Sequence, residues 1–262
     1  MLKPPSNANV ADRLARRVAR EQHSYDEDSV LEESVKLHDR FRHVFHCPNT
    51  RFCEQFMQDR IDELVPDRTV LDYGCGNGWN SVRLLGLRPK KLVGIDISQN
   101  AIEEAVKRAG DNAEFRVMDA HKLEFPDNKF DLVVGRGILH HLEFRIAMQE
   151  VKRVLRKGGY ALFAEPLLDN PLRKVYQCMT PWAHTHDELP LSRKQIRWAD
   201  SLFEADEHVF CGFFSTATGM LTSLLPVSED NLLLVIADKL DRYLMKTPAR
   251  YWMRYVYLTW RK

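Results

Sequence analysis

The chain has 262 residues, with 38 Lys and Arg against 37 Asp and Glu, which gives a formal net charge of +1. A chain this close to neutrality produces no strong electrostatic attraction to nucleic acid or an anionic membrane. This argues against a nucleic-acid enzyme, although a local basic patch on the surface stays open. Hydrophobic residues make up 44% of the chain, and this length and content favour one catalytic domain with an extension or insertion.

The cysteines and the apolar segments indicate the compartment. The five cysteines form no CxxC pair and no zinc-ligand spacing, so we expect reduced thiols and no metal site. The first ten residues lack the apolar core of a signal peptide. The most apolar stretch, residues 220–237, is interrupted by Pro226, Glu229 and Asp230, so no stable membrane insertion is expected. These features predict a cytoplasmic protein.

The start of the chain has apolar residues at helical spacing. This pattern predicts helices over residues 11–22, 29–44 and 51–65, and Pro66 ends the last of them. We therefore expect residues 1–66 to form a helical extension, or lid, that precedes the sheet.

From residue 67 onward, short apolar segments alternate with helical ones. Strands are predicted over residues 68–73, 91–97, 114–118, 130–134 and 160–164. Helices are predicted between most of them, over residues 79–87, 98–110 and 144–155, and Ser98 is the expected N-cap of the second. This alternation predicts an α/β fold with a Rossmann-like, mostly parallel sheet flanked by helices.

The pattern breaks after the fifth predicted strand. Residues 165–205 contain four prolines and scattered aromatic residues, which indicates an insertion that we expect to cap the substrate. A sixth strand over 208–214, helices to about residue 245 and a terminal strand over 251–260 are predicted to complete a domain spanning residues 67–262.

A Gly-rich turn follows the first predicted strand. Residues 70–78 read VLDYGCGNG, which places Gly74, Gly76 and Gly78 at alternate positions. Glycine lets the backbone turn tightly and approach a ligand without an intervening Cβ. The following helix directs unpaired N–H groups and the positive end of its dipole at the turn. This geometry suits a nucleotide-like ligand or a carboxylate.

Acidic residues close the next two strands. Asp96 lies 20 residues beyond Gly76, where a carboxylate can accept hydrogen bonds from both ribose hydroxyls. Asp119 can accept from an adenine amino group, and Ile97 and Met118 offer apolar surfaces to the ring. All lie at the carboxyl ends of strands, where open α/β sheets bind ligands.

Together these segments resemble the class I S-adenosylmethionine (SAM) dependent methyltransferases. Residues 70–78 resemble motif I of that family, and four further segments follow in the family's order and spacing: GIDIS (94–98), MDA (118–120), FDLVVGRGILHHL (130–142) and VLRKGGYALFAEP (154–166). The pattern is most similar to the branch that includes ubiquinone/menaquinone methyltransferases and small-molecule O-methyltransferases.

The resemblance implies SAM as cofactor. In the family the glycine loop passes the methionine part, and the acidic residues after the second and third strands hold ribose and adenine. The cofactor-binding residues implied here are Asp72, Gly74, Cys75, Gly76, Gly78, Asp96, Ile97, Met118, Asp119, Ala120 and Arg136. For Asp72, a structural role in the turn stays open. The G-x-G-x-G spacing differs from the G-x-G-x-x-G of dinucleotide binders and disfavours an NAD-dependent oxidoreductase.

His140 and His141 follow the fourth strand, where the transferred methyl group is expected. A catalytic base and a loop-orienting role are both open for them. The chain lacks the Pro-Pro-aromatic motif of base-modifying enzymes. We therefore expect methyl transfer to a small molecule, on a hydroxyl or carboxylate oxygen. The alternatives are a C-methyltransferase of a quinone-like or lipid acceptor and a non-catalytic SAM-binding subunit. The oligomeric state stays open.

Overall fold

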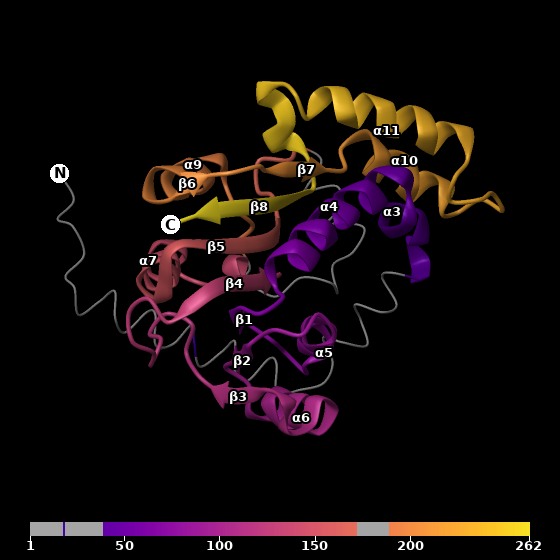
Figure 1. Ribbon diagram of the computed structural model, residues 1–262. Helices are drawn as coiled ribbons and strands as arrows, with labels where there is room; N and C mark the ends of the chain where they lie inside the picture. The colour runs from indigo at the N-terminus through magenta and orange to yellow at the C-terminus, as the bar shows by residue number, and fades with distance from the viewer. Residues whose placement is uncertain (1–17, 19–38, 172–188) are drawn as a thin grey trace.

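The computed structural model describes residue 18 and residues 39–171 and 189–262 (Figure 1). Five parallel strands form the centre of one sheet in the order β3-β2-β1-β4-β5. Their bounds are β1 (Thr69–Tyr73), β2 (Lys91–Asp96), β3 (Glu114–Val117), β4 (Phe130–Arg136) and β5 (Leu155–Pro166). The predicted mostly parallel α/β sheet is confirmed. All five strands end at the same edge, because they run in one direction.

The fifth strand begins earlier than expected. It starts at Leu155, which pairs with Phe130, and the pairing register then shifts before Leu132 pairs with Tyr160. Gly158 adopts a φ of +75° within this irregular stretch. The glycine pair at 158–159 therefore forms a bulge inside the strand, where the sequence indicated a turn before it.

An antiparallel strand completes the sheet. Strand β8 (Tyr255–Arg261) pairs with β5, and the short strands β6 (Glu204–Ala205) and β7 (Val209–Cys211) pair with β8. The predicted strand over 208–214 is too long, because Gly212 adopts a φ of +77° and a helix begins at Phe214. The terminal strand begins at Tyr255 rather than at Tyr251, which lies in the 3-10 helix η4 (Pro248–Trp252).

Helices cover both faces of the sheet. On one face, α4 (Pro48–Leu64) packs Cys53, Met57 and Ile61 against Val70 and Leu132. On the other face, α7 (Phe144–Val154) and α9 (Arg193–Leu202) share a core with alternate residues of the same strands. Helix α9 falls within the predicted insertion. The part of the insertion that forms α9 therefore belongs to the helical layer that covers the sheet.

Two shorter helices follow β1 and β2. They are α5 (Trp79–Gly86) and α6 (Gln99–Ala109), and a 3-10 turn, η1 (Gly110–Asn112), continues α6. Ser98 caps α6 as expected, because its hydroxyl accepts a hydrogen bond from the backbone N–H of Ala101 at 3.1 Å. A second 3-10 turn, η2 (Leu139–His141), follows β4.

The remaining helices lie at one end of the molecule. Helices α10 (Phe214–Thr222) and α11 (Leu232–Leu244) pack on each other, α10 also contacts α3 (Arg42–His46), and α11 contacts α4 (Figure 1). The predicted helix over 11–22, except Val18, and most of the one over 29–44 lie outside the described residues, as does the middle of the expected cap at 172–188. In the part of the chain that the structure describes, every helix is too short or too polar to cross a membrane.

Candidate functional site

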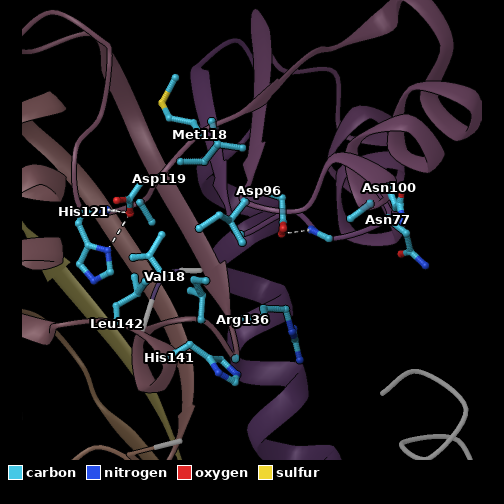
Figure 2. Close-up of a pocket in the computed structure, with 18 of the residues that line it drawn as sticks. Val18, Asn77, Asp96, Asn100, Met118, Asp119, His121, Arg136, His141 and Leu142 are labelled. Carbon is cyan, nitrogen blue, oxygen red and sulfur yellow. Dashed lines mark hydrogen bonds and ion pairs between the residues drawn. The ribbon is translucent and has the colours of Figure 1, made fainter. Parts of the chain in front are cut away.

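A pocket of about 670 Å³ opens at the carboxyl ends of the parallel strands (Figure 2). Nine of the residues predicted for the site line it: Gly74, Gly76, Asp96, Ile97, Met118, Asp119, Ala120, Arg136 and His141. This volume is that of a typical ligand site in proteins. The structure therefore brings together residues from four separate strand ends.

The glycine loop between β1 and α5 forms one wall of the pocket. Gly74 and Cys75 donate backbone hydrogen bonds to the carbonyl of Ile95, which ties the loop to the end of β2. Gly76 has a φ of +51°, and a Cβ placed there would meet no protein atom within 4 Å. At Gly74, by contrast, a Cβ would lie 2.7 Å from the side chain of Ile138. Gly76 therefore leaves space for a ligand, whereas Gly74 allows close packing.

Asp72 holds the glycine loop together from beneath and does not line the pocket. Its buried carboxylate accepts hydrogen bonds from the hydroxyl of Ser81 at 2.6 Å and from Nδ2 of Asn80 at 3.0 Å. Burial raises the pKa of Asp72 to about 6, although these two donors oppose the shift. The geometry favours the structural role that the sequence left open. Cys75 and Gly78 also lie outside the pocket lining.

Asp96 faces the pocket from the end of β2. Its carboxylate accepts backbone hydrogen bonds from Gly76 at 2.9 Å and from Ser98 at 3.0 Å, so it links the glycine loop to the start of α6. Burial raises its pKa, and these N–H donors oppose the rise. A carboxylate held this rigidly is well placed to accept further hydrogen bonds from ligand hydroxyls.

Asp119 lies at the far end of the pocket, where His121 fixes its orientation. Oδ1 of Asp119 accepts hydrogen bonds from the backbone N–H of His121 at 2.8 Å and from its Nδ1 at 2.7 Å. Nε2 of His121 accepts from the backbone N–H of Glu143 at 2.8 Å, so the proton of this imidazole resides on Nδ1. Burial would raise the pKa of Asp119, but the hydrogen bonds from His121 outweigh it and lower the pKa.

Arg136 forms the opposite end of the pocket. Its Nη2 lies 2.6 Å from the carboxylate of Glu54 on α4, and the other oxygen of Glu54 accepts from the hydroxyl of Tyr257 at 2.6 Å. Burial would lower the pKa of Arg136, but the charge of Glu54 raises it overall. The guanidinium is therefore fixed as a cation by Glu54, at the edge of the pocket (Figure 2).

The two histidines after β4 occupy different positions. His141 lines the pocket, whereas His140 lies behind it, and their ring centroids are 4.0 Å apart. Nδ1 of His140 contacts Oε2 of Glu165 at 2.7 Å. The other oxygen of this fully buried carboxylate accepts from the backbone N–H groups of Ile138 and Leu139, at 2.9 Å each. Glu165 therefore holds the whole turn between β4 and α7.

Sequence reasoning missed several residues that line the pocket. These are chiefly Val18, Asn77, Asn100, His121, Gly137 and Leu142. Asn77, Gly137 and Leu142 lie inside the segments that carried the resemblance. His121 follows such a segment directly, and Asn100 lies two residues beyond another. Their position in or next to these motifs could have identified them as pocket residues. Val18 comes from the predicted N-terminal extension, and no local motif marked it.

Comparisons with known proteins show similarity to methyltransferases. Residues 71–163 match the family model of a methyltransferase domain. An uncharacterized methyltransferase of Schizosaccharomyces pombe is 32% identical over 166 residues, which cover 59% of this chain and 56% of the relative. The 27-O-demethylrifamycin SV methyltransferase of Amycolatopsis mediterranei is 35% identical over 121 residues, 43% of this chain and 44% of that protein. The chain thus spans about half the length of these curated relatives.

A solved structure shows the same fold. The N-methyltransferase NodS of Bradyrhizobium japonicum, in complex with S-adenosyl-L-homocysteine, superposes with a TM-score of 0.54 at 18% sequence identity. The match covers 82% of this chain and 88% of that one. It extends the likeness well beyond residues 71–163, to most of the α/β sheet and its helices.

Proposed function

We propose that this chain, whose residues 71–163 match a methyltransferase domain, is a class I SAM-dependent methyltransferase that transfers a methyl group from SAM to an oxygen of a small-molecule acceptor. The observation that supports this most is the convergence of Gly76, Asp96, Asp119 and Arg136 on one pocket. A simple tight turn would not require two carboxylates and a guanidinium around the same space.

The residues fit SAM along the length of the pocket. Asp96 and Asn100 would hold the ribose hydroxyls, and Asp119 would accept from the adenine amino group between Met118 and Leu142. Gly76 leaves the space that the methionine part needs. The Arg136 guanidinium offers a partner for the methionine carboxylate at that end. When bound, SAM supplies an electrophilic methyl group on a sulfonium.

The chain's own contribution to the reaction is mainly alignment. Displacement at a methyl group needs the nucleophile in line and close to the carbon, with water excluded. The turn that carries His141 is fixed by Glu165, so this side chain faces the pocket in a defined position. We assign to His141 the acceptance of a proton from a hydroxyl acceptor, and to His140 the positioning of the turn. A carboxylate acceptor needs no such base.

The choice of oxygen over carbon rests on this histidine and on the similarity to an O-methyltransferase of a natural product. Carbon methylation of a quinone-like or lipid acceptor is the second candidate. This reaction needs an enolate, and the same histidine could generate it by removing a proton from the acceptor. A non-catalytic SAM-binding subunit is the third. Val18 lines the pocket, which supports an N-terminal lid over part of it.

Incubation of the chain with methyl-labelled SAM and a metabolite extract of its host tests the proposal. We expect label to appear in a small molecule, on an oxygen, and not in protein or nucleic acid. Release of the label as methanol by mild alkali would identify an ester. Label on carbon would replace the proposal by the second candidate. Absence of transfer despite SAM binding would favour the third.

A further inference from the structure

We propose that helix α11 docks this protein on an anionic membrane surface. The observation is the orientation of the helix. Its outward side carries Leu232, Leu233, Ile236, Leu240 and Tyr243, which we call the apolar face of α11. Leu232 is 73% exposed and Tyr243 74%, and the others are between 46% and 56% exposed. These residues recur at helical spacing, so they form one continuous stripe.

The acidic residues of the same helix point inward. Asp241 is fully buried and accepts hydrogen bonds from the backbone N–H groups and the hydroxyl at the start of α10, among them Ser215. Asp238 is 9% exposed and accepts from Asn49 and Arg242. The helix therefore turns its acidic side chains, with Leu234 and Ala237, toward the protein, and its apolar face is exposed.

The charges that remain on the outward side are positive. Lys239 is exposed and lies at helical spacing from Leu232 and Ile236, next to the apolar face. Lys246 is also exposed and lies two residues beyond the end of the helix. The acidic residues of α11, Asp238 and Asp241, are both taken up in the interior. An apolar stripe bordered by lysines is the pattern of helices that lie in a membrane interface, where the stripe enters the acyl boundary and the lysines contact anionic headgroups.

The surroundings of the helix extend this surface. Leu221 and Leu224, at the end of α10, are 63% and 65% exposed, and Trp252 after α11 is 50% exposed. Figure 1 shows α11 at the outer edge of the structure, beyond α10 and β7. An exposed surface rich in leucine that includes Tyr243 and Trp252 suits a fluid bilayer, because Tyr and Trp favour the membrane–water interface. None of the helices in residues 39–171 and 189–262 can span a bilayer, so the contact is peripheral.

Flotation of the full chain with vesicles tests this inference independently of methyl transfer. The vesicles are phosphatidylcholine with and without phosphatidylglycerol, at low and high salt. We expect binding to the mixed vesicles, weakened by salt because headgroup attraction is screened. Ile236→Glu should abolish binding. Lys239→Glu and Lys246→Glu should each weaken binding to mixed vesicles by about fivefold or more, from the contribution of one lysine near an anionic surface.

Matched controls keep the test specific. Val106→Glu on α6 replaces a valine that is 48% exposed and lies outside the α10–α11 pair, and Lys90→Glu reverses a charge at the amino end of β2. Both should bind vesicles like the unchanged chain, and melting curves should show all variants folded. Normal flotation of Ile236→Glu would overturn the proposal. So would failure of the unchanged chain to float, or a dimer in light scattering that Ile236→Glu dissociates, since a second copy would then cover the face.

Discussion

Glu165 at the end of β5 reaches across the sheet edge to His140, with 2.7 Å between its Oε2 and Nδ1 of the imidazole. The same carboxylate holds the backbone of the turn through Ile138 and Leu139. The buried carboxylate of Glu165 thus positions the turn that carries both histidines. The two adjacent histidines therefore differ in their surroundings: His140 contacts Glu165, and His141 lines the pocket.

His140→Leu is expected to lower stability. It removes the partner of a fully buried carboxylate, and a hydrogen bond to a charged group contributes about 1.5–3 kcal/mol. Urea denaturation should show this loss in the free energy of unfolding. His141→Leu is the matched control and should cost less, because Glu165 keeps its contact with His140. Equal losses in the two variants would contradict the division of roles.

His141→Gln is expected to reduce turnover by about 10²–10⁴, the usual contribution of a general base. SAM affinity should stay within about threefold, since alignment of the cofactor does not depend on this side chain. Turnover and SAM titration on the same preparation check both statements. Near-normal turnover would mean that no histidine base is used, and would point to a carboxylate or an already ionised acceptor.

Asp96→Ala is expected to weaken SAM binding by about 1.5–3 kcal/mol, because its carboxylate would accept hydrogen bonds from the ribose. Asp131→Ala provides the control: this acid also accepts a backbone hydrogen bond, from Thr69 at 2.9 Å, but at the opposite end of the sheet. Calorimetric titration should show a weaker dissociation constant for the first variant alone. An unchanged constant for Asp96→Ala would remove it from the ribose site.

Gly76→Val is expected to abolish SAM binding and leave the fold largely intact. The new side chain would enter space in which no protein atom lies within 4 Å of the Cβ. Gly158→Val controls for backbone strain, because Gly158 also has a positive φ, +75°, and lies in the bulge of β5. Melting curves and SAM titration together separate the effects. Normal SAM binding by Gly76→Val would show that the loop does not face the cofactor.

Asp72 makes stability depend on pH. Its pKa is about 6 in the folded protein, above the ordinary value of 3.8, so between these values the folded state retains a proton that the unfolded state releases. Stability contributed by this group is therefore complete below about pH 4 and is lost as pH rises toward 6, by up to about 3 kcal/mol. Asp72→Asn should flatten that part of the unfolding profile. A profile identical to that of the unchanged chain would contradict the shifted pKa.

Most of the sheet was predictable because its strands are short, apolar and separated by clear turn and cap signals. Ser98 is an example: a local hydrogen bond to Ala101 determines it. The early start of β5 was not predictable, because a bulge at Gly158 is stabilised by pairing with β4 and β8. Local sequence does not encode such long-range pairing.

The site also contains residues that the sequence predicts and residues whose positions depend on long-range contacts. Gly76, Asp96 and Asp119 follow strands directly, so sequence position alone places them at the pocket. Arg136 is oriented by Glu54, which is 82 residues away, and His121 depends on Glu143. The burial of Asp72 depends on Ser81 in the next helix. These contacts arise from packing between elements that are distant in the sequence, and no sequence motif predicts them.

Calorimetric titration of the unchanged chain with SAM, and separately with NADH, tests the central claim most directly. We predict saturable binding of SAM to a single site, competed by S-adenosylhomocysteine and lost in Gly76→Val, with no heat of binding for NADH. Binding of NADH, or absence of SAM binding by a folded chain, would contradict the assignment of this pocket to SAM.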